Sequence, residues 1–255
     1  MFLPINGQRI NVVAFGPGPR TIIGVGGWAG NWELWQQPFE ELSRTWRTVA
    51  YDHRGAGETV VPIAEITTEG LVADVFGVMD ALSIERCVVG AESSGARTAL
   101  LAALERPERI EGLVLIDGSY LGSPVRDHDP LGDLLRSDFE AAIYQFMERC
   151  TPGEGLEHIR RWGRDILRRS RAVAAVRLRE LGDTPDITER LAEIHIPTLI
   201  IHSARDQIVP VTLSEQLAAR IVGSKIVVLD SDCHVPTMTD AEQVVTAIEE
   251  FFGHT

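Results

Sequence analysis

The sequence predicts an α/β fold: a mostly parallel, eight-stranded sheet flanked by helices. Short runs rich in β-branched residues alternate along the chain with helical patterns. The later runs are apolar at consecutive positions, as expected of strands that are buried on both faces. Strands that alternate with helices favour right-handed β-α-β units, and such units build a parallel sheet.

The first two apolar runs predict a hairpin, and six further runs complete the sheet. "MFLPI" and "QRINVVAF" flank Asn6-Gly7, a dipeptide suited to the positive φ angles of a tight turn. The further runs cover residues 21–26, 47–52, 86–91, 112–117, 197–203 and 225–230. Helical patterns separate them, for example over residues 66–82 and 94–106.

One long segment, residues 120–190, breaks this alternation. It carries arginine-rich helical patterns and four prolines but no convincing strand. An insertion of this size between two strands predicts a helical lid over the edge of the sheet. The core domain is then expected to comprise residues 1–119 and 191–255.

Composition narrows the class of protein. The 255 residues are 44% hydrophobic and 24% charged, which is typical of a globular chain. A formal net charge of −13 argues against a nucleic-acid partner, and no apolar run is long enough to span a bilayer. We see no signal peptide, and three widely spaced cysteines argue against a disulfide framework or a zinc site. We therefore expect a cytoplasmic protein without a membrane partner or a bound metal; its oligomeric state stays open.

Reactive side chains follow several predicted strands, and ligands of open parallel sheets bind beyond the carboxyl ends of the strands. "GGWAG" follows the strand over residues 21–26, and Glu92, Ser93 and Ser94 follow the strand over residues 86–91. Asp206 and His234 follow the last two strands. A serine, an acid and a histidine in this order are typical of a hydrolase triad on a nucleophile elbow.

The stretch "GAESSGAR" offers three candidate nucleophiles. At an elbow, the residues two before and two after the nucleophile must be small, because the turn brings them against neighbouring backbone. Ser94 fails this condition, since Glu92 precedes it by two residues. Ser93, flanked by Ala91 and Gly95, and Glu92 both satisfy it. A carboxylate can also form a covalent ester intermediate, so the residues alone leave Ser93 and Glu92 open.

Four segments together resemble the α/β-hydrolase superfamily over nearly the whole chain outside the lid. They run from "TIIGVGGWAGNWELWQQPFEELSRTWRTVAYDHRGAGET" through "CVVGAESSGARTALLAALERPERIEGLVLIDGS" and "IPTLIIHSARDQIVP" to "SDCHVP". The resemblance favours Ser93 over Glu92, because Pro107 lies at the family's usual distance from Ser93 and carboxylate nucleophiles in the family are typically aspartates. In size and layout the chain is similar to 3-oxoadipate enol-lactonases and meta-cleavage hydrolases.

The resemblance also implies partners for Ser93. His234 would be the general base and Asp206 the acid that orients it, with Asp117 as the alternative acid because some members take it from that strand. The backbone N–H groups of Trp28 and Ser94 would form the oxyanion hole. Gly26-Gly27 replaces the family's common His-Gly, a departure that is expected to loosen this loop.

The function implied is a serine hydrolase that cleaves a small-molecule carboxylic ester or lactone through an acyl-enzyme, with no cofactor. Three alternatives are a C–C bond hydrolase with the same triad, an enzyme with Glu92 as nucleophile, and a hormone-receptor-like protein that binds a ligand.

Gly27, Trp28 and Glu92 are the candidate substrate-binding residues. The arginines of the lid are expected to form a solvated, ion-paired surface. The alternative is that one or two of them point inward and bind a substrate carboxylate. A negative charge on Glu92 beside the nucleophile would disfavour such anionic substrates. "DHRGAGET" (residues 52–59) is expected to be a structural loop.

Overall fold

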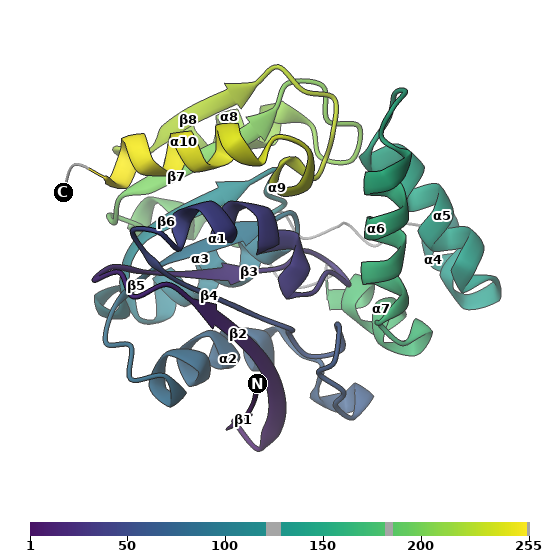
Figure 1. The fold of residues 1–255 in the computed structure, drawn as a ribbon, viewed down its shortest axis with the longest axis horizontal. Helices are drawn as coiled ribbons and strands as arrows, with labels where there is room; N and C mark the ends of the chain where they lie inside the picture. Colours follow the sequence, from purple (N-terminus) through teal and green to yellow (C-terminus); the bar gives the residue numbers. More distant parts are fainter. Residues whose placement is uncertain (121–128, 182–185, 254–255) are drawn as a thin grey trace.

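The computed structural model describes residues 1–120, 129–181 and 186–253. It contains one eight-stranded sheet in the order β1-β2-β4-β3-β5-β6-β7-β8 (Figure 1). The strands are β1 (Phe2–Ile5), β2 (Gln8–Phe15), β3 (Thr21–Val25), β4 (Arg47–Tyr51), β5 (Cys87–Glu92), β6 (Ile110–Ile116), β7 (Thr198–Ser203) and β8 (Lys225–Leu229). All eight fall within or next to the runs predicted from the sequence.

The strand pairing confirms a mostly parallel sheet. β1 with β2 and β2 with β4 are antiparallel, and the other five pairs, from β4–β3 to β7–β8, are parallel. Asn6 and Gly7 have φ angles of 49° and 74° at the β1–β2 turn, the conformation that an Asn-Gly hairpin adopts.

Helices cover both faces of the sheet. One hydrophobic cluster joins the sheet to α2 (Thr68–Ala81), α3 (Gly95–Glu105) and α8 (Val211–Arg220). The other joins it to α1 (Gln36–Leu42) and α10 (Ala241–Phe252). The central strands alternate between the two clusters: Val89 and Leu113 belong to the first, Val88 and Val114 to the second. Burial on both faces explains why these strands read as unbroken apolar runs.

The Trp35 ring packs directly against β3 and β5, the two strands that lead into the candidate site. A Cβ on Gly24 of β3 would lie 2.6 Å from the Trp35 ring, and a Cβ on Gly90 of β5 would lie at the same distance. The two glycines therefore let the indole lie flat against the sheet. Its Nε1 donates a 3.2 Å hydrogen bond to the carbonyl of Val25, at the end of β3.

Between β6 and β7 the described residues form helices and no strand. These are α4 (Pro130–Ser137), α5 (Phe139–Cys150), α6 (Glu157–Arg168), α7 (Ala172–Glu180) and the 3-10 turn η5 (Thr188–Glu193). In Figure 1, α4 to α7 stand together as a group beside the sheet, apart from the helices on its faces. In the described part of the chain, no helix combines the length and the apolar character needed to cross a bilayer.

Candidate active site

Ser93 occupies a sharp turn between β5 and α3. Its φ of 52° is in the left-handed region, which side-chain-bearing residues rarely adopt. Ser93 N donates to the Ile116 carbonyl at 2.9 Å, and Ser119 N donates to the Ser93 carbonyl at 3.0 Å. A Cβ on Gly95 would lie 2.6 Å from the Gly26 carbonyl oxygen, so the turn accepts only glycine there.

A chain of two hydrogen bonds links Ser93, His234 and Asp206. The Ser93 Oγ lies 2.8 Å from His234 Nε2, and His234 Nδ1 lies 2.6 Å from Asp206 Oδ2. The other carboxyl oxygen of Asp206 accepts hydrogen bonds from the backbone N–H groups of Ile208 and Val209. The loop therefore holds the Asp206 carboxyl group in place, and that group orients the His234 ring.

Burial and the neighbouring carboxyl groups act in opposite directions on the pKa of His234. The ring is 2% exposed, and burial alone lowers the pKa of an imidazole. The hydrogen bond to Asp206 and the charge of its carboxylate, with smaller contributions from Asp117 and Glu92, together outweigh this effect, and the pKa of His234 is raised above its ordinary value. The arrangement stabilises the imidazolium that a general base becomes when it takes a proton.

Asp117, the alternative acid, lies in the same region but forms its hydrogen bonds with Ser203. Its carboxyl oxygens accept hydrogen bonds from Ser203 N at 2.7 Å and Ser203 Oγ at 3.2 Å. These bonds join the ends of β6 and β7, and no hydrogen bond links Asp117 to His234 in the described residues. Burial raises the pKa of Asp117 to about 6.

The loop after β3 brings Gly27 and Trp28 against the nucleophile. A Cβ on Gly27 would lie 3.0 Å from Ser93 Cβ. The Gly27 carbonyl accepts a hydrogen bond from Gly30 N at 3.0 Å and lies 3.1 Å from His53 Nε2. Because the peptide bond is trans, the Trp28 N–H points away from this held carbonyl. The Gly26-Gly27 sequence was expected to loosen the loop, but these contacts fix it.

Ser94 begins the helix behind the nucleophile. It is the N-cap of α3, so its backbone N–H lies at a helix N-terminus, where the partial positive charge favours an anion.

Glu92 is bonded to the helix that follows His234. It is 1% exposed, and its Oε1 accepts a 2.9 Å hydrogen bond from Thr237 Oγ1 of α9 (Pro236–Thr239). Oε2 is buried and has no hydrogen-bond partner in the described residues. Burial raises the pKa of Glu92 to about 8, so its carboxyl group is neutral at neutral pH. The negative charge expected beside the nucleophile is therefore suppressed.

The loop over residues 52–59 makes contacts with several other segments of the chain in addition to forming a turn. Asp52 accepts hydrogen bonds from Asn11, Trp32 N and Glu58 N, and Arg54 forms a buried, bidentate ion pair with Asp74. His53 reaches across to Gly27, and nothing in the sequence signals this contact between loops that follow different strands.

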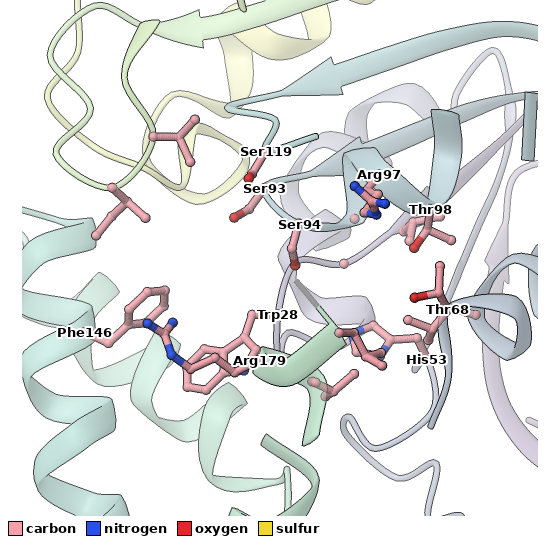
Figure 2. A pocket seen from close by; sticks show the side chains of 18 of the residues that line it. Trp28, His53, Thr68, Ser93, Ser94, Arg97, Thr98, Ser119, Phe146 and Arg179 are labelled. Carbon is pink, nitrogen blue, oxygen red and sulfur yellow. The ribbon is translucent and has the colours of Figure 1, made fainter. Parts of the chain in front are cut away.

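A cavity of about 230 Å³ opens onto Ser93. In Figure 2, Ser93 and Ser94 lie on one side of it and Trp28, Phe146 and Arg179 on the other. Trp28 also donates through its Nε1 to the Ala175 carbonyl of α7 at 2.8 Å. Its ring meets Phe146 edge to face, with centroids 5.1 Å apart.

Most arginines in the described part of residues 120–190 pair with acids or with backbone carbonyls. Arg160 and Arg164 contact Glu157, Arg168 contacts Glu140, and Arg169 contacts Glu33. Arg179 lines the large cavity, but its guanidinium forms a bidentate ion pair with Asp129.

Three ligand-type atoms, from Asp117, Asp206 and His234, lie within 4.8 Å of one another. Both ring nitrogens of His234 already make hydrogen bonds to protein groups. A metal bound there would have to displace the Asp206 contact that orients the imidazole.

Comparison with known proteins identifies the family to which the chain belongs. A model described as "alpha/beta hydrolase fold" matches residues 20–152, just over half of the chain. The putative carbamate hydrolase RutD of Agrobacterium fabrum is 30% identical over 252 residues, which are 91% of this chain and 92% of that protein. A Karrikin insensitive 2 receptor of Petunia hybrida is 24% identical over 96% of both chains.

Solved structures share the fold. The enol-lactonase from Burkholderia xenovorans superposes with a TM-score of 0.92 at 22% identity, covering 99% of this chain and 100% of that one. Structures of a meta-cleavage product hydrolase and of esterases also share it. The chain belongs to the α/β-hydrolase fold family.

Proposed function

We propose that the protein is a serine hydrolase that cleaves a carboxylic ester or lactone through an acyl-enzyme intermediate. The observation that carries this proposal is the hydrogen-bond chain from Ser93 through His234 to Asp206. In this proposal the three residues act as nucleophile, general base and orienting acid.

In the acylation step, Ser93 Oγ attacks the carbonyl carbon while His234 Nε2 takes the hydroxyl proton. The Trp28 and Ser94 N–H groups donate to the oxyanion that forms. When the C–O bond breaks, its electron pair stays on the leaving oxygen, and His234 returns the proton to it. The products of this half-reaction are the Ser93 ester and an alcohol, which for a lactone stays joined to the acyl group.

Deacylation repeats the same steps with water as the nucleophile. His234 takes a proton from the water as its oxygen attacks the Ser93 ester, and then returns the proton to Ser93 Oγ. The carboxylic acid leaves, and Asp206 stays ionised throughout, holding the imidazole in place.

Residues 120–190 are proposed as a lid over this site. Support comes from α5 and α7, because Phe146 lines the large cavity and Ala175 is bonded to the Trp28 indole. Covering helices exclude water and shape the pocket in hydrolytic enzymes.

A fluorophosphonate probe tests the proposal, because it labels only an activated serine. We expect one adduct, located at Ser93 by mass spectrometry, together with multiple turnovers of ethyl esters of short carboxylic acids. Ser93→Ala should lose both. Turnover that persists in Ser93→Ala, with label from 18O-water entering Glu92, would overturn the proposal in favour of a carboxylate nucleophile.

A receptor function is the second candidate, favoured by the similarity to the Petunia karrikin receptor along nearly the whole chain. A receptor with the same triad would be labelled at Ser93 but would complete a single slow turnover. Release of many product molecules per protein separates the enzyme from the receptor. A C–C hydrolase would instead turn over a vinylogous β-diketone faster than any ester.

A further inference from the structure

A second, smaller cavity also borders the nucleophile. Its volume is about 40 Å³, and Trp28, Ser93 and Phe146 form walls of both cavities. Its remaining walls are mostly the apolar side chains of Ala29, Leu34, Met147, Ile166, Leu167 and Met238.

The polar groups at this small cavity are already engaged. His234 hydrogen-bonds to Ser93 and Asp206, and Glu92 accepts from Thr237 through Oε1. The exception is Glu92 Oε2, which is buried and has no partner in the described residues. An ordered water needs two to four polar partners, whereas cavities with apolar walls favour apolar occupants. The chemistry of the walls therefore suits an alkyl group.

The position of His234 indicates which part of a substrate the small cavity faces. His234 lines the small cavity and is not among the residues that line the large one. In an acyl transfer the leaving oxygen receives its proton from the general base, so it lies next to the imidazole. The acyl part then extends into the large cavity, where His53, Thr98 and Ser119 present polar atoms.

The volume limits the length of the alkyl group. A group the size of a water molecule needs roughly 10–15 Å³ of cavity volume. The small cavity of about 40 Å³ therefore has room for about three groups of that size. We propose that the small cavity is the subsite for the leaving alcohol and restricts the substrate to open-chain esters with an alkoxy group of up to about three carbons. A small lactone fits less well, because one ring holds both halves of its ester. This inference rests on the proposed serine hydrolase function.

Met147 and Leu167 are the residues through which the cavity can be enlarged. They belong to α5 and α6, line the small cavity and not the large one, and are 3% and 5% exposed. Leu178 of α7 lines the large cavity instead and provides the matched control. Met147→Ala, Leu167→Ala and Leu178→Ala each remove part of one apolar side chain from one cavity wall.

The experiment measures kcat/KM by titration of the released acid for two series of esters. One series varies the alkoxy group from methyl to octyl on one acid, and the other varies the acid with the ethoxy group kept. For the wild type, kcat/KM should fall by about tenfold or more between ethyl and butyl esters, because overfilling a packed cavity is costly. Met147→Ala or Leu167→Ala should reduce this fall to about threefold or less and leave the acyl series unchanged, whereas Leu178→Ala should change the acyl series alone.

A flat alkoxy series in the wild type, or a Met147→Ala effect confined to the acyl series, would overturn the subsite assignment. Thermal melting shows whether each variant is folded, and Leu167→Ala replaces Met147→Ala if the latter is not. Failure of the function itself has a different signature, since no ester would then turn over and Ser93 would not take the fluorophosphonate label.

Discussion

Thr237 donates a 2.9 Å hydrogen bond to the carboxyl group of Glu92, which joins the helix after His234 to the strand that ends at the nucleophile. Glu92 is buried near His234, Asp117 and Asp206, and the charges of these three residues affect its pKa. Glu92 in turn affects the pKa of Cys150 in α5. Because burial raises its pKa, the carboxyl group fills this position without a charge.

The Glu92 proton couples stability to pH. The unfolded chain releases it near pH 4.5 and the folded chain near about 8, so the free energy of unfolding falls as pH rises through this window. Glu92→Gln keeps an acceptor for Thr237 and cannot ionise. It should therefore be more stable than the wild type at about pH 8 by a few kcal/mol, because each unit of pKa shift corresponds to about 1.4 kcal/mol.

Urea denaturation at several pH values measures this difference. At pH values below 4.5 the two proteins should be nearly equal in stability. Parallel curves for the wild type and Glu92→Gln over the whole range would show that Glu92 is ionised in the folded protein.

Asp206→Asn and Asp117→Asn should differ sharply. Asparagine at position 206 cannot stabilise the imidazolium, and we expect kcat to fall by about 10³–10⁴-fold. The acid limb of the kcat/KM profile should also move to lower pH, since Asp206 contributes most to raising the pKa of His234. Steady-state rates on an ethyl ester from about pH 5 to pH 9 measure both effects.

Asp117→Asn should lower kcat by less than about tenfold, because its carboxyl group bonds Ser203 and not His234. Its cost should appear in stability, at about 1–3 kcal/mol, through weakened contacts between buried groups. A larger loss of kcat for Asp117→Asn than for Asp206→Asn would reverse the assignment of the acid.

His53→Ala should impair the oxyanion donor without touching the triad. The contact of His53 with the Gly27 carbonyl holds the peptide whose N–H belongs to Trp28. We expect kcat to fall by about tenfold or more, less than the 10²–10³ reported for outright loss of an oxyanion donor, with a smaller change in KM. Binding of a trifluoromethyl ketone, which mimics the oxyanion, should weaken by a similar factor.

Thionoesters provide the control for this variant, because sulfur gains less from the N–H donors than oxygen does. The loss for a thionoester should therefore be smaller than for the matched ester. Equal losses for both substrates would indicate that His53 acts only by supporting the fold.

Gly95→Ala should destabilise the turn at the nucleophile. The new methyl group would lie 2.6 Å from the Gly26 carbonyl oxygen, and backbone cannot yield as a flexible side chain does. We expect a loss of about 1–3 kcal/mol, typical of overpacking, and a large fall in kcat, measured by urea denaturation and ester turnover. A variant with wild-type stability and rate would show that the loop before Trp28 can retreat.

The strands and the elbow were predictable because their physical causes are local. Apolar runs of strand length mark the buried sheet, and small residues around Ser93 mark a sharp turn. Ser93, Asp206 and His234 could be placed at strand ends for the same reason. The roles of these residues stay predictions until the variants above are measured.

Contacts between distant loops could not be predicted. Nothing near His53 in the sequence indicates that its ring meets Gly27, and nothing near Glu92 indicates Thr237. The neutrality of Glu92 depends on burial, which only the assembled fold creates. Likewise, Asp117 and Asp206 end neighbouring strands with similar sequence signals, and only the three-dimensional arrangement shows which of them meets His234.

The bond between the Trp28 indole and the Ala175 carbonyl connects the helices proposed as a lid to the proposed oxyanion hole. One residue carries both a side chain anchored to α7 and the backbone N–H proposed to receive the oxyanion. A displacement of α7 that lets a ligand in or out would pull on that peptide and misalign the donor. The rate of cleavage would then depend on the position of α7, and an ester would be cleaved only when the helices cover it.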